Sequence, residues 1–183
     1  KYPNIWIMSD DIYEKIIFDN FLFSTIAEVN PKLINRTLTV NGVSKAYSMT
    51  GWRIGYAGGP IDLIKAMAKI QSQSTSNPSS ISQAAALEAL SSNNDFIKKR
   101  NNSFFSRKNL IIEIINSSNG LFCKNPEGAF YIFPSCKDLF GKSTLSGMKI
   151  LNSNDFCKYL LEEKGVAVVS GSAFGMDGYF RIS

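Results

Sequence analysis

Short apolar runs bounded by polar residues mark three predicted strands in the first part of the chain. The run Ile5 to Met8 ends at Ser9 and Asp10, a pattern typical of a buried parallel strand with polar side chains at its carboxyl end. Residues 36–40 and 52–57 are predicted as the next two strands. Open α/β sheets bind ligands beyond the carboxyl ends of their strands, so Asp10 lies where a ligand is expected.

Amphipathic stretches follow these strands and predict helices. One helix is expected to begin at Pro60, and another at Pro78, continuing through the alanine-rich segment 84–90. The apolar residues on one face of the first helix are Leu63, Ile64, Met67 and Ile70. We expect both helices to cover the sheet.

A long amphipathic pattern over residues 94–117 predicts a helix that leads into a second, smaller domain, with Gly120 as a stop signal. Its apolar stripe consists of Ile97, Phe104, Ile111 and Ile115. The remaining α/β elements are expected to be strands over 128–133, 166–169 and 179–182, and a helix over 154–164 with Ser153 as its cap and Gly165 at its end. The predicted domains are therefore residues 1–93 and 94–183.

The composition indicates a globular protein, because 44% of the 183 residues are hydrophobic and 19% are charged. No apolar run reaches the roughly 20 residues of a membrane span, and no signal-peptide pattern is visible, so we expect no membrane partner and a cytoplasmic location. Cys123, Cys136 and Cys157 have no CxxC spacing, which indicates neither a disulfide framework nor a zinc site. Both ends lie at predicted strands, so we expect a piece of a longer polypeptide.

Histidine is absent from the sequence, which removes Ser-His-Asp and Cys-His nucleophiles and histidine-based metal sites. The net charge of +5 is compatible with nucleic acid, and equally with a site that collects a phosphate cofactor and acidic substrates. The densest basic cluster, Lys98 to Arg100, is interpreted as the solvated face of a helix. No basic patch interleaved with aromatic residues favours base stacking, so no nucleic-acid partner is expected.

One continuous segment, residues 42–55, carries the most specific pattern of the chain. It reads Gly-Val-Ser-Lys-Ala-Tyr-Ser-Met-Thr-Gly-Trp-Arg-Ile-Gly and resembles the pyridoxal-phosphate attachment site of class I aminotransferases at every position. Residues 9–14, Ser-Asp-Asp-Ile-Tyr-Glu, and residues 178–183, Gly-Tyr-Phe-Arg-Ile-Ser, resemble the same family in the same order. The resemblance covers nearly the whole chain, and it is closest to bacterial aspartate aminotransferases.

This resemblance implies an α/β fold, that of the fold-type I transferases that depend on pyridoxal 5'-phosphate (PLP). The chain would then hold part of the large mixed-sheet cofactor domain and an incomplete, smaller C-terminal α/β domain. A long N-terminal portion and a short C-terminal tail would lie outside it. Relatives are homodimers with sites shared across the interface, so a homodimer is expected.

The resemblance also assigns roles to residues that bind the cofactor. Lys45 would be the Schiff-base lysine and, once released, the base and acid that moves the substrate's α proton. Asp10 would keep the pyridine nitrogen protonated, because a nearby carboxylate raises the pKa of that nitrogen. Tyr13 would donate its hydroxyl to the phenolic oxygen of the cofactor. Asp11 receives no cofactor role.

The phosphate of the cofactor and the carboxylate of the substrate both require cationic or hydroxyl donors. Arg53 resembles the family arginine that binds the phosphate as a bidentate donor, and Ser44 is expected to add a hydroxyl. Relatives often carry a further serine where this chain has Gly42, so its phosphate contacts are expected to be distributed differently. Arg181 resembles the arginine that binds the α-carboxylate of the substrate.

The expected activity is transfer of the amino group of aspartate or glutamate to a 2-oxo acid through a PLP Schiff base on Lys45, with no metal. The substrates would be small amino acids and 2-oxo acids. A lyase, a cyclopropane-forming synthase or an aminotransferase-like regulator can share the lysine signature, so these stay open as alternatives. A basic nucleic-acid-binding domain with an incidental lysine is a further alternative.

Overall fold

The computed structural model describes residues 2–93 and 95–183 of the chain. Contacts between residues divide it into two compact units, the first ending at Arg100 and the second running from Asn101 to Ser183. None of the helices in the described ranges combines the length and the apolar character that crossing a membrane requires.

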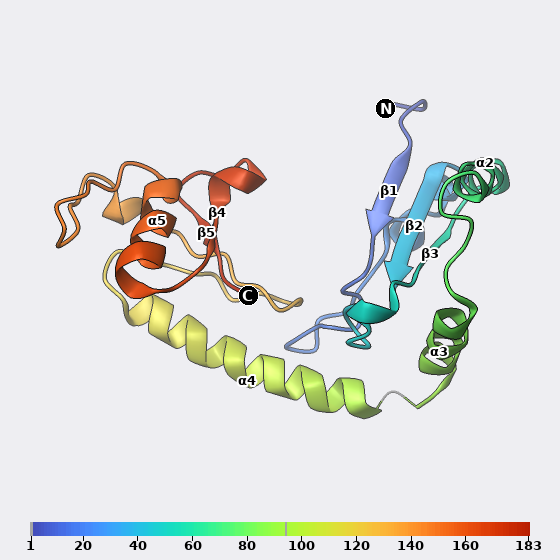
Figure 1. Cartoon of the computed structure of the whole chain (residues 1–183), viewed down its shortest axis with the longest axis horizontal. Coiled ribbons are helices and arrows are strands. Elements are labelled where there is room, and N and C mark those ends of the chain that lie inside the picture. The colour runs from blue at the N-terminus through green and yellow to red at the C-terminus, as the bar shows by residue number, and fades with distance from the viewer. Residues whose placement is uncertain (1, 94) are drawn as a thin grey trace. The chain divides into compact units, whose positions relative to one another are not determined.

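The first unit contains a three-stranded sheet in the order β1-β2-β3 (Figure 1). Its strands are β1 (Ile7–Asp10), β2 (Thr37–Gly42) and β3 (Gly55–Gly58). β1 runs parallel to β2, with Asp10 opposite Val40, and β3 runs antiparallel to β2, with Gly42 opposite Gly55. The carboxyl ends of β1 and β2 therefore meet the amino end of β3 at one edge of the sheet.

The first strand differs from its prediction in position and in burial. It begins at Ile7 and ends at Asp10, so it is shifted by two residues toward the C-terminus relative to the predicted run from Ile5 to Met8. Its side chains alternate between half-buried and exposed. Trp6 and Met8 are 59% and 72% exposed. The predicted parallel orientation is confirmed by the pairing with β2, whereas the predicted burial is wrong, because burial depends on what covers the two faces of the strand.

Helical segments connect the strands of the first unit and follow them. They are α1 (Ile26–Val29), η1 (Pro31–Arg36), η2 (Thr50–Trp52), α2 (Ile61–Ser72) and α3 (Ser80–Ser91). The helices expected after Pro60 and Pro78 are thus confirmed. α2 contains no buried residue, and Ile70 on its predicted apolar face is 71% exposed, so the predicted burial of that face is wrong.

The core of the first unit gathers around the turn that follows β2. Its buried members are Val43, Ala46, Tyr47, Ile54, Ala86 and Ile97. Ala86 comes from α3, and Ile97 comes from α4 (Asp95–Ser117). The segment that carries Lys45 is therefore anchored by apolar side chains from two helices that lie far along the sequence.

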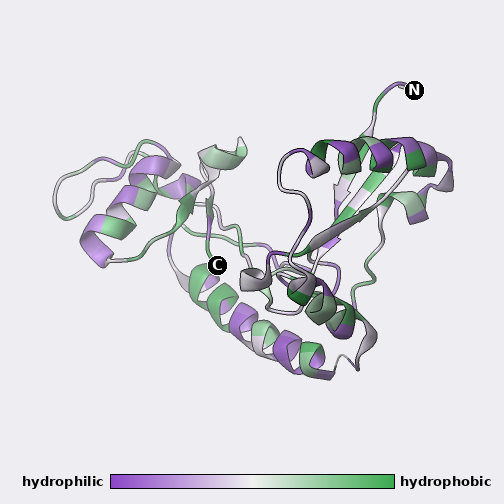
Figure 2. Ribbon diagram, turned by 45° about the vertical axis from the view of Figure 1, so that its right-hand side comes forward, coloured by the Kyte–Doolittle hydropathy of each residue, from purple (hydrophilic) through white to green (hydrophobic). Residues whose placement is uncertain are grey.

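The long helix predicted over 94–117 is confirmed as α4 from Asp95 onward, and Asn94 lies outside the described residues. Hydrophobic and hydrophilic residues alternate along α4 (Figure 2). The second unit then contains η3 (Lys137–Leu139), α5 (Ser153–Lys164), β4 (Val169–Ser170), η4 (Gly171–Phe174) and β5 (Phe180–Arg181). β4 pairs antiparallel with β5.

Three predictions in the second unit need correction. The strand expected over 166–169 is observed only at its end, where Val169 begins β4. Residues 128–133 do not form a continuous strand: Ala129 adopts a φ of 60°, and Gly128 and Ile132 form isolated bridges, that of Ile132 to Ile182. The cap of α5 is Asn152 and not Ser153: the side-chain oxygen of Asn152 accepts a hydrogen bond from the amide of Asp155 at 3.0 Å. The predicted end of this helix at Gly165 is confirmed by its left-handed φ of 68°.

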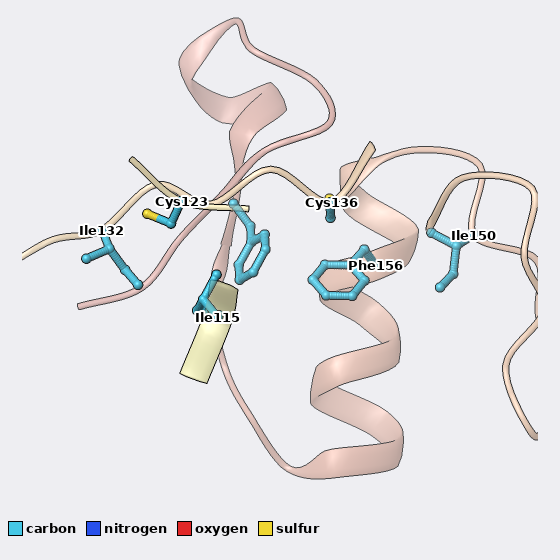
Figure 3. Packing of buried hydrophobic residues seen from close by; sticks show 7 residues of the cluster. Ile115, Cys123, Ile132, Cys136, Ile150 and Phe156 are labelled. Atoms are coloured by element: carbon cyan, nitrogen blue, oxygen red, sulfur yellow. The ribbon is translucent and has the colours of Figure 1, made fainter. Parts of the chain in front are cut away.

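The core of the second unit is formed by side chains from α4, α5, β5 and the segments on either side of η3 (Figure 3). Its buried members are Ile115, Cys123, Ile132, Cys136, Ile150, Phe156 and Phe180. The rings of Phe156 and Phe180 lie 4.9 Å apart, and burial of such a side chain contributes about 1.5–3 kcal/mol. All three cysteines are free thiols, and burial raises the pKa of Cys136 to about 12.

Ser153, in the first turn of α5, ties this helix to the segment before β5. It is completely buried, and its amide and hydroxyl donate hydrogen bonds to Oδ1 of Asp177 at 2.8 and 2.5 Å. The hydroxyl of Ser153 also lies 2.8 Å from that of Ser170. The hydroxyl bond, followed by the amide bond, holds the pKa of Asp177 below its ordinary value of 3.8.

Replacing Asp177 with asparagine is expected to lower the melting temperature at pH 7, because Ser153 then loses its charged acceptor. A carboxylate whose folded pKa is depressed stabilises the fold above its unfolded pKa, and this stability is lost as the pH falls through the folded pKa. The difference in melting temperature between the parent and Asp177→Asn should therefore shrink as the pH falls from about 5 toward 2. Thermal unfolding by circular dichroism measures it.

Asp138→Asn, which changes an exposed aspartate on η3, is the matched control and should give no comparable pH-dependent difference. A difference for Asp177→Asn that stays constant across this pH range would contradict the role of the ionised carboxylate.

Candidate functional site

Five of the predicted site residues lie at one edge of the sheet in the first unit. Asp10 is the last residue of β1, and Tyr13 lies in the turn that follows. Ser44 and Lys45 lie in the turn directly after β2, and Arg53 comes shortly before β3. The parallel pairing of β1 with β2 and the antiparallel pairing of β3 bring these segments to the same edge.

The turn at residues 44–47 positions Lys45. Its flanking residues Val43 and Ala46 are 0% and 4% exposed, whereas Ser44 and Lys45 are half-buried. The amide of Ser48 donates to the carbonyl of Lys45 at 3.1 Å, and Ser48 adopts a left-handed φ of 53°. Apolar packing thus fixes the backbone, while the lysine side chain keeps access to the surface.

Gly42 lies where β2 and β3 approach each other closely. A Cβ at this position would lie 3.0 Å from the carbonyl oxygen of Ile54 and 3.4 Å from Cα of Gly55. The serine that relatives often carry here would therefore require the neighbouring backbone to shift by a few tenths of an ångström.

The two aspartates after β1 have different surroundings. Asp10 is exposed, and its Oδ1 accepts a bond from the amide of Ile12 at 3.3 Å. Asp11 is 7% exposed, and its Oδ1 accepts a bond from the hydroxyl of Ser9 at 2.7 Å. The carboxylate of Asp11 is thus engaged within the fold, whereas that of Asp10 faces outward at the strand end.

Arg53 is held in an unusual backbone conformation. Its φ and ψ of 55° and 48° are left-handed, a region that costs a non-glycine residue of order 1 kcal/mol or more and is concentrated at functional sites. Nη1 donates to the carbonyl of Thr50 at 2.9 Å. The guanidinium is exposed and keeps further N–H groups for an anionic ligand.

Tyr47 and Tyr56 also belong to this edge, although the sequence motifs assign no role to them. Tyr47 is 6% exposed, and its hydroxyl is buried without a hydrogen-bond partner among the described residues. Partial burial, then the carboxylate of Glu14, then Tyr47 raise the pKa of Tyr56. Tyr47 lies inside the lysine motif, and this position in the sequence could have identified it as a site residue.

Arg181, the sixth predicted residue, lies in β5 of the second unit. Its Cζ is 4.6 Å from the ring centre of Tyr131 and 5.1 Å from that of Phe174, distances typical of cation–π contacts. Its Nε is buried without a hydrogen-bond partner among the residues that the structure describes. The two rings hold the guanidinium while leaving hydrogen-bonding capacity.

Comparisons with known proteins agree with this arrangement. The family model for aminotransferase class I and II matches residues 1–183. The aspartate aminotransferase of Rhizobium meliloti (strain 1021) is 58% identical over all 183 residues, which cover 45% of that protein. The aspartate/prephenate aminotransferase of Cereibacter sphaeroides is 55% identical, again over the whole chain and 46% of the relative.

The solved structures include a crystal structure of the aspartate aminotransferase from Rhizobium meliloti. It matches with a TM-score of 0.96 at 58% identity, over 100% of this chain and 46% of that one. The chain therefore belongs to the aminotransferase class I and II family. The predicted family and the predicted α/β fold class of the fold-type I transferases are both confirmed. The chain spans about half the length of these relatives.

Proposed function

We propose that the protein is a PLP-dependent aminotransferase that moves the amino group of aspartate or glutamate to a 2-oxo acid. The names of relatives 55% and 58% identical to the chain support the reaction and the acidic substrate. The observation that carries the proposal is the sheet edge, where an amine, a carboxylate and a guanidinium, from Lys45, Asp10 and Arg53, come together.

The residues at this edge fit the chemistry of PLP. The exposed guanidinium of Arg53 and the hydroxyl of Ser44 suit a phosphate, and the carboxylate of Asp10 suits a protonated ring nitrogen. The buried hydroxyl of Tyr47 has no partner among the described residues, and a buried polar group of this kind normally has one. Its position in the lysine turn supports a polar ligand at this edge of the sheet.

When bound, PLP supplies an electron sink for the electron pair left at the substrate's α carbon. The proposed roles of the chain's own residues follow from their chemistry. Lys45 would tether the cofactor and, once released, would take the α proton and return it. Asp10 would hold the proton at the ring nitrogen, Tyr13 would donate to the phenolic oxygen, and Arg53 with Ser44 would bind the phosphate.

Arg181 is proposed to bind the α-carboxylate of the substrate through two parallel N–H bonds. We further propose that residues 1–93 are part of the large PLP-binding domain, and that residues 94–183 form the interdomain helix and part of the small domain.

The free thiols favour a reducing, cytoplasmic location. Family resemblance supports a homodimer as the working assembly, which light scattering tests.

The experiment that tests the activity uses the full-length protein, loaded with PLP and supplied with L-aspartate. We expect oxaloacetate to form beyond one equivalent per site only when a 2-oxo acid such as 2-oxoglutarate is present, and this further oxaloacetate should equal the glutamate produced. Ammonia release without a 2-oxo acid would support a lyase instead. Retention of PLP without turnover of any amino acid would support a regulator. Either outcome would contradict the proposed aminotransferase activity.

A further inference from the structure

The first two turns of α4 pack directly on the turn that carries Lys45. Ile97 is 6% exposed and belongs to the same buried cluster as Val43, Ala46 and Tyr47. The ring of Phe96 lies 6.1 Å from that of Tyr47 at an interplanar angle of 56°. Both contacts lie within the first unit, so this part of α4 packs against the turn that carries Lys45.

Arg100 adds a polar contact to this packing. Its Nη1 donates to the carbonyl of Ala46 at 3.1 Å, and its Cζ lies 4.8 Å from the ring centre of Phe96. Arg100 is half-buried, whereas its neighbours Lys98 and Lys99 are exposed. The interpretation of this basic cluster as a solvated face is therefore confirmed for the two lysines and wrong for the arginine.

The bond from Arg100 differs in kind from the other backbone bonds of the turn. The carbonyls of Lys45 and Val43 accept from the amides of Ser48 and Met49 at 3.1 and 3.4 Å, which are local bonds. The carbonyl of Ala46 accepts from a residue 54 positions away. A buried carbonyl needs a partner, and a charged donor makes a stronger bond than a neutral one.

We propose that Arg100 is a positioning residue for Lys45. By binding the carbonyl next to the lysine, it fixes the backbone from which the reactive amine extends. Proton transfer depends on a supporting shell that holds the amine within a fraction of an ångström. This role in the reaction rests on the proposed aminotransferase function, whereas the anchoring of the turn does not depend on it.

The anchoring is tested by amide hydrogen exchange on the full-length protein without PLP. Arg100→Met keeps an apolar chain of similar length beside Phe96 and removes the donors. We expect amide exchange in the segment 43–50 to accelerate by roughly tenfold, because losing a hydrogen bond from a charged donor lowers the free energy of local opening by a corresponding amount. Arg107→Met, an exposed arginine on the same helix, should leave this segment unchanged. Unchanged exchange in Arg100→Met would overturn the proposal.

The consequence for the reaction is tested by steady-state kinetics on the PLP-loaded protein. Arg100→Met should lower kcat roughly tenfold while KM for L-aspartate stays within about twofold, because the substrate's own contacts remain. Arg100→Lys keeps one charged donor for the carbonyl and should recover part of the lost kcat. Arg100→Lys also tests the proposal if Arg100→Met folds poorly. Its kcat should be lower than that of the parent, and its amide exchange in the segment 43–50 should be faster.

The outcomes separate the two proposals. A parent protein without transaminase activity contradicts the proposed function, while the exchange experiment still decides whether Arg100 anchors the turn. An active parent whose kcat is unchanged in Arg100→Met and Arg100→Lys overturns the positioning role. A rise in KM with constant kcat would also overturn it, because that pattern indicates a substrate contact.

Discussion

Replacing Lys45 with alanine is expected to reduce turnover of L-aspartate by about 10²- to 10⁴-fold, the range that a positioned general base contributes. The methyl group of alanine can neither tether PLP nor move a proton. The fold should survive, because the packing of this turn comes from Val43, Ala46 and Tyr47, while Lys45 is half-buried. Kinetics and thermal unfolding of the full-length protein measure the two expectations.

Covalent attachment provides a second readout that does not depend on turnover. After borohydride reduction of the PLP-loaded protein, peptide mapping should place a phosphopyridoxyl group within residues 42–55 in the parent and not in Lys45→Ala. Lys65→Ala, an exposed lysine on α2, is the control and should retain both the label and the activity.

Lys45→Arg distinguishes the charge of the residue from its basicity. A guanidinium keeps the positive charge but stays protonated at working pH, so it cannot accept the α proton. We expect this variant to be as inactive as Lys45→Ala. Normal turnover in either variant would remove Lys45 from the reaction and with it the central claim of the proposed function.

The site elements that the sequence predicted well are those that depend on contiguous residues. The lysine motif over 42–55 and the segment 9–14 each lie next to a strand, and parallel pairing brings strand ends to one edge. Parallel pairing therefore brings Asp10 and Lys45 to the same edge, and Arg53 reaches it because β3 runs antiparallel to β2. Specific backbone features, such as the left-handed conformation of Arg53, are set by the fold around η2 and were not predicted.

Properties that depend on distant residues were predicted less well. The basic run Lys98 to Arg100 gives no local signal that Arg100 contacts a carbonyl 54 positions away. Met8 lies in an apolar run and is nevertheless 72% exposed, because burial of a strand depends on the layers that cover it. Residues 128–133 have a strand-like composition, but the left-handed φ of Ala129 interrupts the extended backbone.

Replacing Arg181 with alanine is expected to weaken the binding of L-aspartate by about 2–4 kcal/mol, which is roughly a 30- to 1000-fold rise in its dissociation constant. The reason is the loss of a charge-assisted, bidentate partner for the α-carboxylate. The guanidinium is already held between Tyr131 and Phe174 at 4.6 and 5.1 Å, so little ordering is left for substrate binding to impose. PLP should remain attached to Lys45.

Arg181→Lys keeps the charge near the two rings and reduces the risk of a collapsed site. An ammonium lacks the planar fork that pairs with both carboxylate oxygens, so we expect part of the affinity to be lost in this variant too. Arg107→Ala, an exposed arginine on α4, is the control for nonspecific charge effects and should bind L-aspartate like the parent. Titration of the PLP-loaded proteins with L-aspartate, followed by absorbance, measures the constants.

The choice of amino acid shows which carboxylate Arg181 binds. L-alanine has the α-carboxylate but lacks the distal one, so Arg181→Ala should weaken L-alanine and L-aspartate by the same factor. A loss confined to L-aspartate would assign Arg181 to the distal carboxylate, and unchanged affinity for both would exclude it from the substrate site. Nε of Arg181 is buried without a partner among the described residues, and such a donor is costly to leave unpaired. A bound carboxylate should therefore raise the melting temperature of the parent, whereas it should not raise that of Arg181→Ala.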